Sequence, residues 1–146
     1  MDGGGQALFA FVRHWSRRWN TSAGDDHGQR GRDVLVVEAV HALQDRGGVT
    51  VNKVAAELNL DQSNASRMLA HAVTAGYLQA GPGRLDRRRR DVQLTDAGRQ
   101  LLADAHAWQD QTFADLTTSW TVTERTTFVE AMHRLITASA TLEDGD

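Results

Sequence analysis

The stretch from Tyr77 to Leu94 constrains the fold of this chain more than any other. Residues 77–80 and 92–94 alternate between apolar and polar side chains, which is the pattern of half-buried strands. Between them, Gly81-Pro82-Gly83 breaks the first strand and an arginine run follows, with five arginines in seven positions: Arg84, Arg87, Arg88, Arg89 and Arg90. Two short strands around a loop of about ten residues predict a β-hairpin with an extended, basic tip.

Two helices joined by a short turn are predicted before this hairpin. Thr50 or Asn52 can cap the first, which is expected to end near Leu58. The second is opened by Asp61 or Ser63 and stops at Gly76. The inward faces are expected to hold Val54, Ala55 and Leu58 of the first helix and Ala65, Met68, Leu69, Ala72 and Val73 of the second.

Helices are also expected on both sides of this core, at residues 7–20, 33–46, 96–117 and 124–140. Asp33 is the predicted cap of the second of these, and Asn20–Arg32 before it is interpreted as a polar, glycine-containing loop. Val49–Val51 is a short β-branched stretch that can add a rung to the sheet. The fold class is therefore mainly α with a small β-hairpin wing, a winged helix-turn-helix flanked by N- and C-terminal helices.

Charge is unevenly distributed along the chain, whose formal net charge is −3. Residues 1–48 are balanced, residues 49–99 carry eight basic and five acidic side chains, and residues 100–146 carry two basic and eight acidic ones. A basic module between neutral and acidic ends can bind a polyanion on one face.

Several function classes are excluded or disfavoured by composition. The chain has no cysteine, so disulfides, thiolate metal sites and cysteine redox sensing are excluded. No apolar run approaches the roughly 20 residues that span a bilayer, and the N-terminus does not resemble a signal peptide. No nucleophile triad, phosphate loop or metal-ligand spacing is visible, and the six histidines are scattered. We expect no enzyme, cofactor, metal or membrane partner.

The outward face of the second helix carries short hydrogen-bonding side chains and one arginine. Asn and Gln can pair with adenine, Arg with guanine, and Ser with either. The alternative is an ordinary solvated face, but such a face usually carries Glu and Lys, and this one has neither. The arginine run suits phosphates and narrow minor grooves, and its alternative is a solubilising charge run. The predicted DNA-binding residues of the helix are Gln62, Ser63, Asn64, Ser66, Arg67 and His71, beside the five arginines.

The sequence resembles the MarR family of winged helix-turn-helix transcriptional regulators at four places. Residues 86–98, Asp-Arg-Arg-Arg-Arg-Asp-Val-Gln-Leu-Thr-Asp-Ala-Gly, resemble its wing pattern, Asp-Arg-Arg followed by Val-x-Leu-Thr-x-x-Gly. Residues 54–58 resemble its first helix-turn-helix helix, residues 63–68 the start of its recognition helix, and residues 76–78 the exit into its wing. The resemblance covers about residues 34–105, and the flanking helices match in length and order only.

The resemblance implies a homodimer on a roughly palindromic operator, with the recognition helix in the major groove and a wing arginine in the minor groove. It implies that Asp86 pairs with Arg88 to stabilise the wing. One domain, 1–146, would then contain the winged helix-turn-helix at 34–98 and dimerisation helices at 7–20 and 99–140. All four Trp and all four Phe lie in these flanks; an intrachain core is the alternative. The predicted dimer interface comprises Phe9, Phe11, Trp15, Phe128, Met132 and Leu135.

The functional hypothesis is therefore a cytoplasmic, nucleoid-associated bacterial regulator that binds double-stranded DNA and acts as a repressor. Family members often bind small aromatic or anionic effectors, so release by an effector is a further hypothesis. Residues 21–33 depart from the family pattern, so no ligand is named. The rival hypothesis is a winged-helix protein-interaction module without sequence-specific DNA binding. An enzyme with a winged-helix appendage is disfavoured because no residues remain for a catalytic domain.

Overall fold

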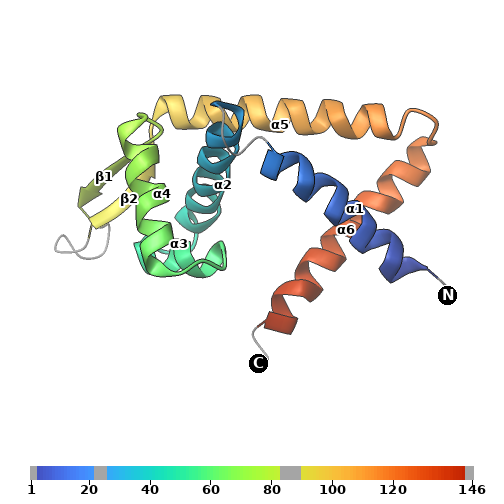
Figure 1. Ribbon diagram of the computed structural model, residues 1–146, viewed down its shortest axis with the longest axis horizontal. Helices are drawn as coiled ribbons and strands as arrows, with labels where there is room; N and C mark the ends of the chain where they lie inside the picture. Colours follow the sequence, from blue (N-terminus) through green and yellow to red (C-terminus); the bar gives the residue numbers. More distant parts are fainter. Residues whose placement is uncertain (1–2, 22–25, 83–89, 144–146) are drawn as a thin grey trace. The chain divides into compact units, whose positions relative to one another are not determined.

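The computed structural model describes residues 3–21, 26–82 and 90–143. Within these ranges the predicted fold class, helical with a β-hairpin, is confirmed. The chain divides into two compact units, residues 1–105 and 106–146. Its elements are α1 (Gly4–Thr21), α2 (Asp26–Gln44), α3 (Val51–Glu57), α4 (Gln62–Thr74), β1 (Leu78–Pro82), β2 (Arg90–Leu94), α5 (Asp96–Leu116) and α6 (Val122–Glu143) (Figure 1).

The hydrophobic core of the first unit lies between α2, α3, α4, the hairpin and the start of α5. In Figure 1, α4 lies beside α2 and the β1–β2 hairpin, with α3 packed across the ends of α2 and α4. Burying these aliphatic side chains is the main force that holds the short helices together. The buried cluster comprises Val36, Val37, Ala39, Val40, Leu43, Val49, Val54, Leu69, Ala72, Leu78, Val92, Leu94, Leu101 and Leu102.

The helix-turn-helix begins and ends where the sequence predicts. Thr50 caps α3, since its Oγ1 accepts a hydrogen bond of 3.3 Å from the backbone N–H of Lys53. Asn59 in the turn has a positive φ of 51°, which asparagine tolerates better than most residues. Asp61 caps α4, and Gly76 follows the helix with a φ of 88°, a left-handed conformation that favours glycine. One inward prediction is wrong: Val73 is 40% exposed.

The hairpin pairs β1 antiparallel to β2, with Leu78 opposite Leu94 and Pro82 opposite Arg90. The first strand therefore extends through Gly81 to Pro82, further than the predicted break. A proline is tolerated at a strand end because no ladder hydrogen bond needs its missing N–H there. Val49 is not in a strand, but its carbonyl accepts a hydrogen bond of 3.3 Å from the backbone N–H of Val92. The predicted third rung is thus reduced to a single bond.

Thr95 and Gly98 connect the hairpin to α5. The backbone N–H of Thr95 donates to the Tyr77 carbonyl at 3.0 Å, and its hydroxyl donates to the Gly76 carbonyl. The same hydroxyl oxygen accepts from the backbone N–H of Gly98 at 3.1 Å, which caps α5. A Cβ at Gly98 would overlap the Tyr77 carbonyl oxygen and would lie 3.1 Å from its carbon. The glycine of the Leu-Thr-x-x-Gly pattern is therefore explained by the close packing of α5 against the start of the wing.

The loop predicted over Asn20–Arg32 is wrong from Asp26 onward, because α2 begins there. Asp33 is consequently not a cap; it lies inside the helix with its side chain 7% exposed. Glycines within a helix each cost roughly 1 kcal/mol relative to alanine, which is why the segment looked like a loop. The contact of the buried Asp33 with His71 favours the helix here, whereas the exposed Arg30–Asp104 ion pair at 3.8 Å adds little.

The second unit contains the end of α5, a turn, and α6. Thr121 and Glu124 form a reciprocal capping box at the start of α6: Thr121 N–H donates to Glu124 at 2.7 Å, and Glu124 N–H donates to the Thr121 hydroxyl at 3.2 Å. The ring of Phe128 stacks on Phe113 at 5.9 Å and meets Trp120 edge-on at 5.3 Å. The predicted helix over 124–140 is confirmed, with two more residues at its start and three at its end.

Candidate nucleic-acid interface

The first two turns of α4 present the polar face that the sequence predicts. Gln62, Ser63, Ser66 and Arg67 are exposed, while Asn64 is half-buried. The opposite face of the helix buries Ala65, Leu69 and Ala72 against the core, and these residues fix which way the helix faces. The helix is therefore held by its apolar side, and its hydrogen-bonding side chains are available to a partner.

Three of the residues at the start of α4 are linked to one another. Asp61 uses one carboxylate oxygen to accept from the backbone N–H of Asn64 at 2.8 Å. Its other oxygen accepts from the side-chain amide of Asn64, also at 2.8 Å. The side-chain oxygen Oδ1 of Asn64 in turn accepts from a guanidinium N–H of Arg67. The sequence shows Asp61 as a cap, but the continuation to Arg67 emerges only in the structure.

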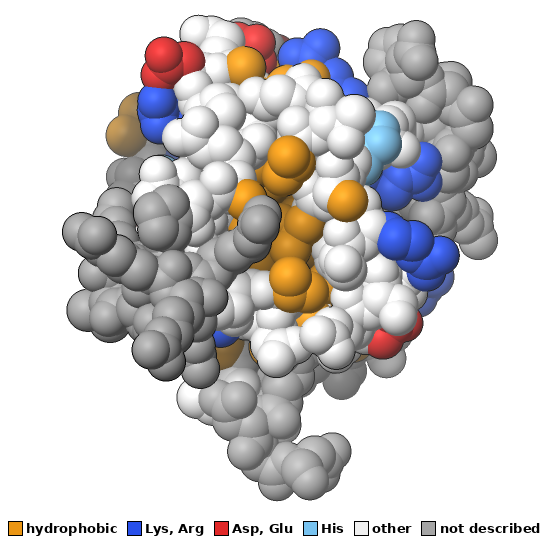
Figure 2. Space-filling view, turned by 90° about the vertical axis from the view of Figure 1, so that its left-hand side faces the viewer, with side chains coloured by type: hydrophobic (Ala, Val, Ile, Leu, Met, Phe, Trp, Pro, Cys, Tyr) orange, Lys and Arg blue, Asp and Glu red, His pale blue; other side chains and the backbone are white. Residues whose placement is uncertain are grey.

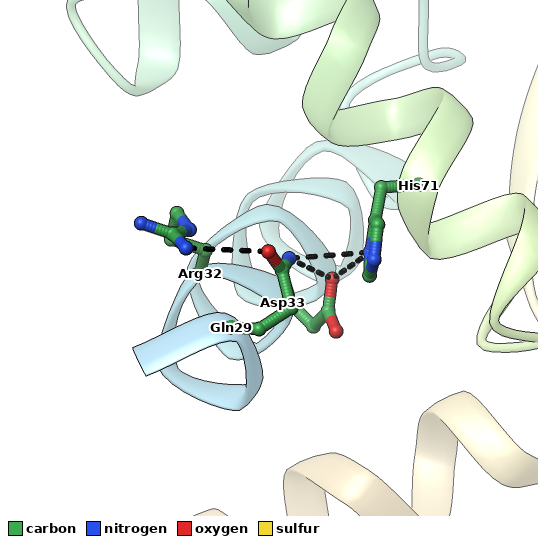
Figure 3. Close-up of polar contacts among 4 residues, drawn as sticks. All are labelled: Gln29, Arg32, Asp33 and His71. Atoms are coloured by element: carbon green, nitrogen blue, oxygen red, sulfur yellow. Dashed lines mark hydrogen bonds and ion pairs between the residues drawn. The ribbon is translucent and has the colours of Figure 1, made fainter. Parts of the chain in front are cut away.

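His71 lies in a different environment from the other predicted DNA-binding residues of α4. Its Nδ1 is 2.9 Å from Oδ1 of the buried Asp33 and 3.2 Å from Nε2 of Gln29, both on α2 (Figure 3). Arg32 donates to the side-chain oxygen Oε1 of Gln29 at 3.3 Å and extends the cluster outward. The His71 side chain is 48% exposed. Its ring thus joins two helices within the chain, and DNA contact by His71 stays a prediction.

In Figure 2 the molecule is turned so that the left-hand side of Figure 1, where the hairpin lies, faces the viewer. Hydrophobic side chains form a strip in its middle, and Lys and Arg side chains gather along its right-hand edge beside a histidine. The acidic side chains in view lie at the rim. Lys and Arg side chains also appear at the top and the upper left, so the described basic side chains lie around the rim of this face rather than in its middle.

Most of the predicted wing contacts lie outside the described residues. These are Arg84, Asp86, Arg87, Arg88 and Arg89, and the proposed Asp86–Arg88 pair is among them. Arg90 is described by its backbone alone, as the first residue of β2. The roles of all six residues stay predictions.

Asp91, beside the arginine run, has a structural role that the sequence analysis missed. Its side chain is buried, and Oδ1 accepts from the backbone N–H of Val49 at 2.7 Å. This bond ties the base of the wing to the segment between α2 and α3. An acidic residue at the end of an arginine run is a signal for such an anchor. Its partner cannot be read from the sequence, because it is a backbone N–H 42 positions away.

The predicted dimer residues divide between the two units, and each group leaves apolar surface uncovered. On α1, Phe9 is 61% and Phe11 is 53% exposed, and Trp15 is half-buried with its ring 6.2 Å from that of Phe11. On α6, Phe128 and Leu135 are exposed and Met132 is half-buried. A dimer interface and an intrachain core thus both stay open for these side chains, and their role in a dimer stays a prediction.

Two other kinds of site are not found among the described residues. No group of three His, Asp or Glu side chains there is placed to hold a metal ion. None of the described helices has both the length and the apolar character needed to cross a membrane.

Comparison with known proteins gives a matching family model for part of the chain and a fold for most of it. A family model described as MarR family matches residues 32–89, which include the helix-turn-helix and much of the wing. No curated protein matches the chain. Solved structures match over most of the chain at low sequence identity. The likeness therefore shows the fold alone.

Three of these structures show how far the likeness extends. The crystal structure of MarR matches at a TM-score of 0.69 with 15% identity, covering 95% of this chain and 92% of that one. A MarR family transcriptional regulator from Silicibacter pomeroyi matches at 0.62 with 21% identity, covering 91% and 86%. A mutant of S. aureus MepR bound to an oligodeoxyribonucleotide matches at 0.58 with 16% identity, covering 91% and 96%. The helix-turn-helix region of this chain therefore matches the MarR family model, and the solved structures show the same fold.

Proposed function

We propose that this protein is a sequence-specific, double-stranded DNA-binding transcriptional regulator that acts as a homodimer and represses transcription. The observation that carries the proposal is the exposed polar face at the start of α4. Gln62, Ser63, Ser66 and Arg67 are free of the core there, on a helix whose other side is buried. A helix enters the major groove with such N-terminal residues leading.

The arginine run between the two strands also supports the proposal. Its first four arginines fall between β1 and β2 in the sequence, and the fifth, Arg90, begins β2 opposite Pro82. Arginines at such a hairpin tip suit phosphate contacts and the minor groove, which supply affinity rather than sequence information. MepR, which shares the fold, is known in complex with an oligodeoxyribonucleotide, and this favours DNA as the partner here.

The uncovered apolar side chains of the flanking helices support a homodimer. Phe9 and Phe11 on α1 and Ile136 and Leu142 on α6 are all more than half exposed. Monomeric proteins rarely expose large apolar patches, and such patches commonly mark an interface. A two-fold dimer presents two copies of α4, and their spacing of roughly 34 Å, one turn of DNA, would select a palindromic operator.

Repression follows from the proposal if the operator overlaps a promoter, because a bound dimer blocks access to it. The predicted localisation at the bacterial nucleoid is part of the same proposal. Release by a small-molecule effector stays a hypothesis, and no described cavity identifies a ligand.

The experiment that tests the proposal is selection from a randomised duplex DNA pool, followed by affinity measurements against salt. An enriched inverted repeat, bound with a steep salt dependence, would support a dimeric sequence-specific regulator, since phosphate contacts release counterions. Weak, salt-insensitive binding without enrichment would contradict it. That outcome would favour the rival hypothesis, a winged-helix module that binds a protein.

A further inference from the structure

The side-chain amide of Asn64 is engaged at both ends within the chain. Its Nδ2 donates to Asp61 at 2.8 Å, and its Oδ1 accepts from Arg67. The chemistry of the neighbours fixes this orientation, because a carboxylate only accepts hydrogen bonds and a guanidinium only donates them. An asparagine between them must turn its NH₂ toward Asp61 and its oxygen toward Arg67.

This arrangement conflicts with a reading role for Asn64. Adenine recognition by asparagine uses both the oxygen and the NH₂ of the amide at once, toward N6 and N7 of the base. In α4 both groups point along the helix surface toward Asp61 and Arg67, and the residue is only half exposed. The position nonetheless lies one turn before Arg67, where it can control that side chain.

We propose that Asp61 and Asn64 are positioning residues that hold Arg67 for the recognition of one guanine in each half-site. The inference rests on the proposed function and assigns a division of labour within it. Arg67 has five N–H donors, and the bond to Asn64 uses one of them. The others remain for the O6 and N7 acceptors of guanine, the commonest specific arginine contact in the major groove.

The charge of Asp61 argues in the same direction. A carboxylate at the leading end of a DNA-binding helix repels phosphates, so it lowers general affinity for DNA. Its two oxygens fix the start of the helix and the orientation of Asn64. A residue that lowers general affinity while ordering the reading arginine increases the difference between correct and incorrect sequences.

The test is Asp61→Asn, measured on the selected operator and on duplexes substituted at each position. An asparagine keeps an oxygen to cap the helix but replaces the second oxygen with an NH₂, which cannot accept from Asn64. We expect discrimination at one G·C pair of each half-site to fall by about tenfold. Binding to unrelated DNA should stay equal or tighten, and the thermal unfolding midpoint should change little.

Two further variants test whether the affected G·C pair is the one that Arg67 recognises. Arg67→Ala should lose discrimination at the same G·C pair, and adding Asp61→Asn to it should change nothing further there. Asn64→Ala should behave like Asp61→Asn. The charge-matched control is Asp96→Asn, which removes an exposed carboxylate that pairs with Arg99 at the same i, i+3 spacing on α5; discrimination should be unchanged.

Two results would overturn the inference, and they differ. If Asn64→Ala lost discrimination at an A·T pair instead, Asn64 would read adenine, and the proposed function would stand without the positioning role. If the unaltered protein enriched no sequence at all, the proposed function would fail and the inference with it.

Discussion

Oδ1 of Asp33 lies 2.9 Å from Nδ1 of His71, and this contact joins α2 to α4 across 38 positions of sequence. The carboxylate is almost fully buried, whereas the imidazole is about half exposed. A buried carboxylate is costly unless it is paired or hydrogen-bonded, so His71 and Gln29 make its burial tolerable. The orientation of α4, which carries the predicted reading face, thereby depends on a residue of α2.

Removal of the histidine should destabilise the fold. In His71→Ala, Asp33 keeps only the longer contact with Gln29, at 3.4 Å, and the free energy of unfolding should fall by about 1–3 kcal/mol. Urea unfolding at fixed protein concentration measures this. In an Asp33→Asn background the same change should cost less, because a neutral amide is cheaper to bury. Equal losses in both backgrounds would show that the two residues are not coupled.

Substitution of Gly98 should be more damaging than its position on a helix suggests. In Gly98→Ala the new methyl group would overlap the Tyr77 carbonyl, so α5 or the start of the wing must shift. We expect a loss of about 1–3 kcal/mol in unfolding free energy, the usual effect of overpacking, and weaker DNA binding. Gly31→Ala is the matched control: nothing lies within 4 Å of a Cβ there, so it should stabilise α2 by up to about 1 kcal/mol. Similar effects of the two substitutions would contradict the close approach at Gly98.

Arg67 and Arg88 should fail in different ways when replaced by alanine. Arg67→Ala removes a base contact, so binding to the operator should weaken by about 1–3 kcal/mol and specificity should relax. Arg88→Ala should weaken binding to all sequences and lower the slope of affinity against salt by about 1, as expected for a phosphate contact. Titration of operator and unrelated duplexes at several salt concentrations separates the two. An equal loss on every sequence for Arg67→Ala would refute its assignment to base reading.

An aspartate on the exposed apolar side of α6 should prevent dimer formation. Leu135 is 46% exposed in the single chain, and Leu135→Asp would place a charge in the proposed interface, where it would have no partner. Analytical ultracentrifugation should show a shift from dimer to monomer, with a parallel loss of cooperative operator binding. Val73→Asp, at a residue 40% exposed on α4, is the control and should stay dimeric. A dimeric Leu135→Asp protein would place the interface elsewhere.

Short-range chemistry made much of this fold predictable. Caps such as Thr50 and Asp61 act on backbone groups three residues away, and Gly76 stops its helix through its own φ. The reading face of α4 was visible for the same reason, since helical periodicity places its polar residues together whatever surrounds them.

The sequence by itself therefore determined the order of the elements, the winged helix-turn-helix and the candidate reading residues. Only the tertiary structure decided where α2 begins, because the buried Asp33 has its partner on α4. Only it decided that Asp91 anchors the wing to Val49, 42 positions away. These outcomes depend on desolvation and on contacts between distant segments, whose energies exceed the local preferences that a sequence pattern records.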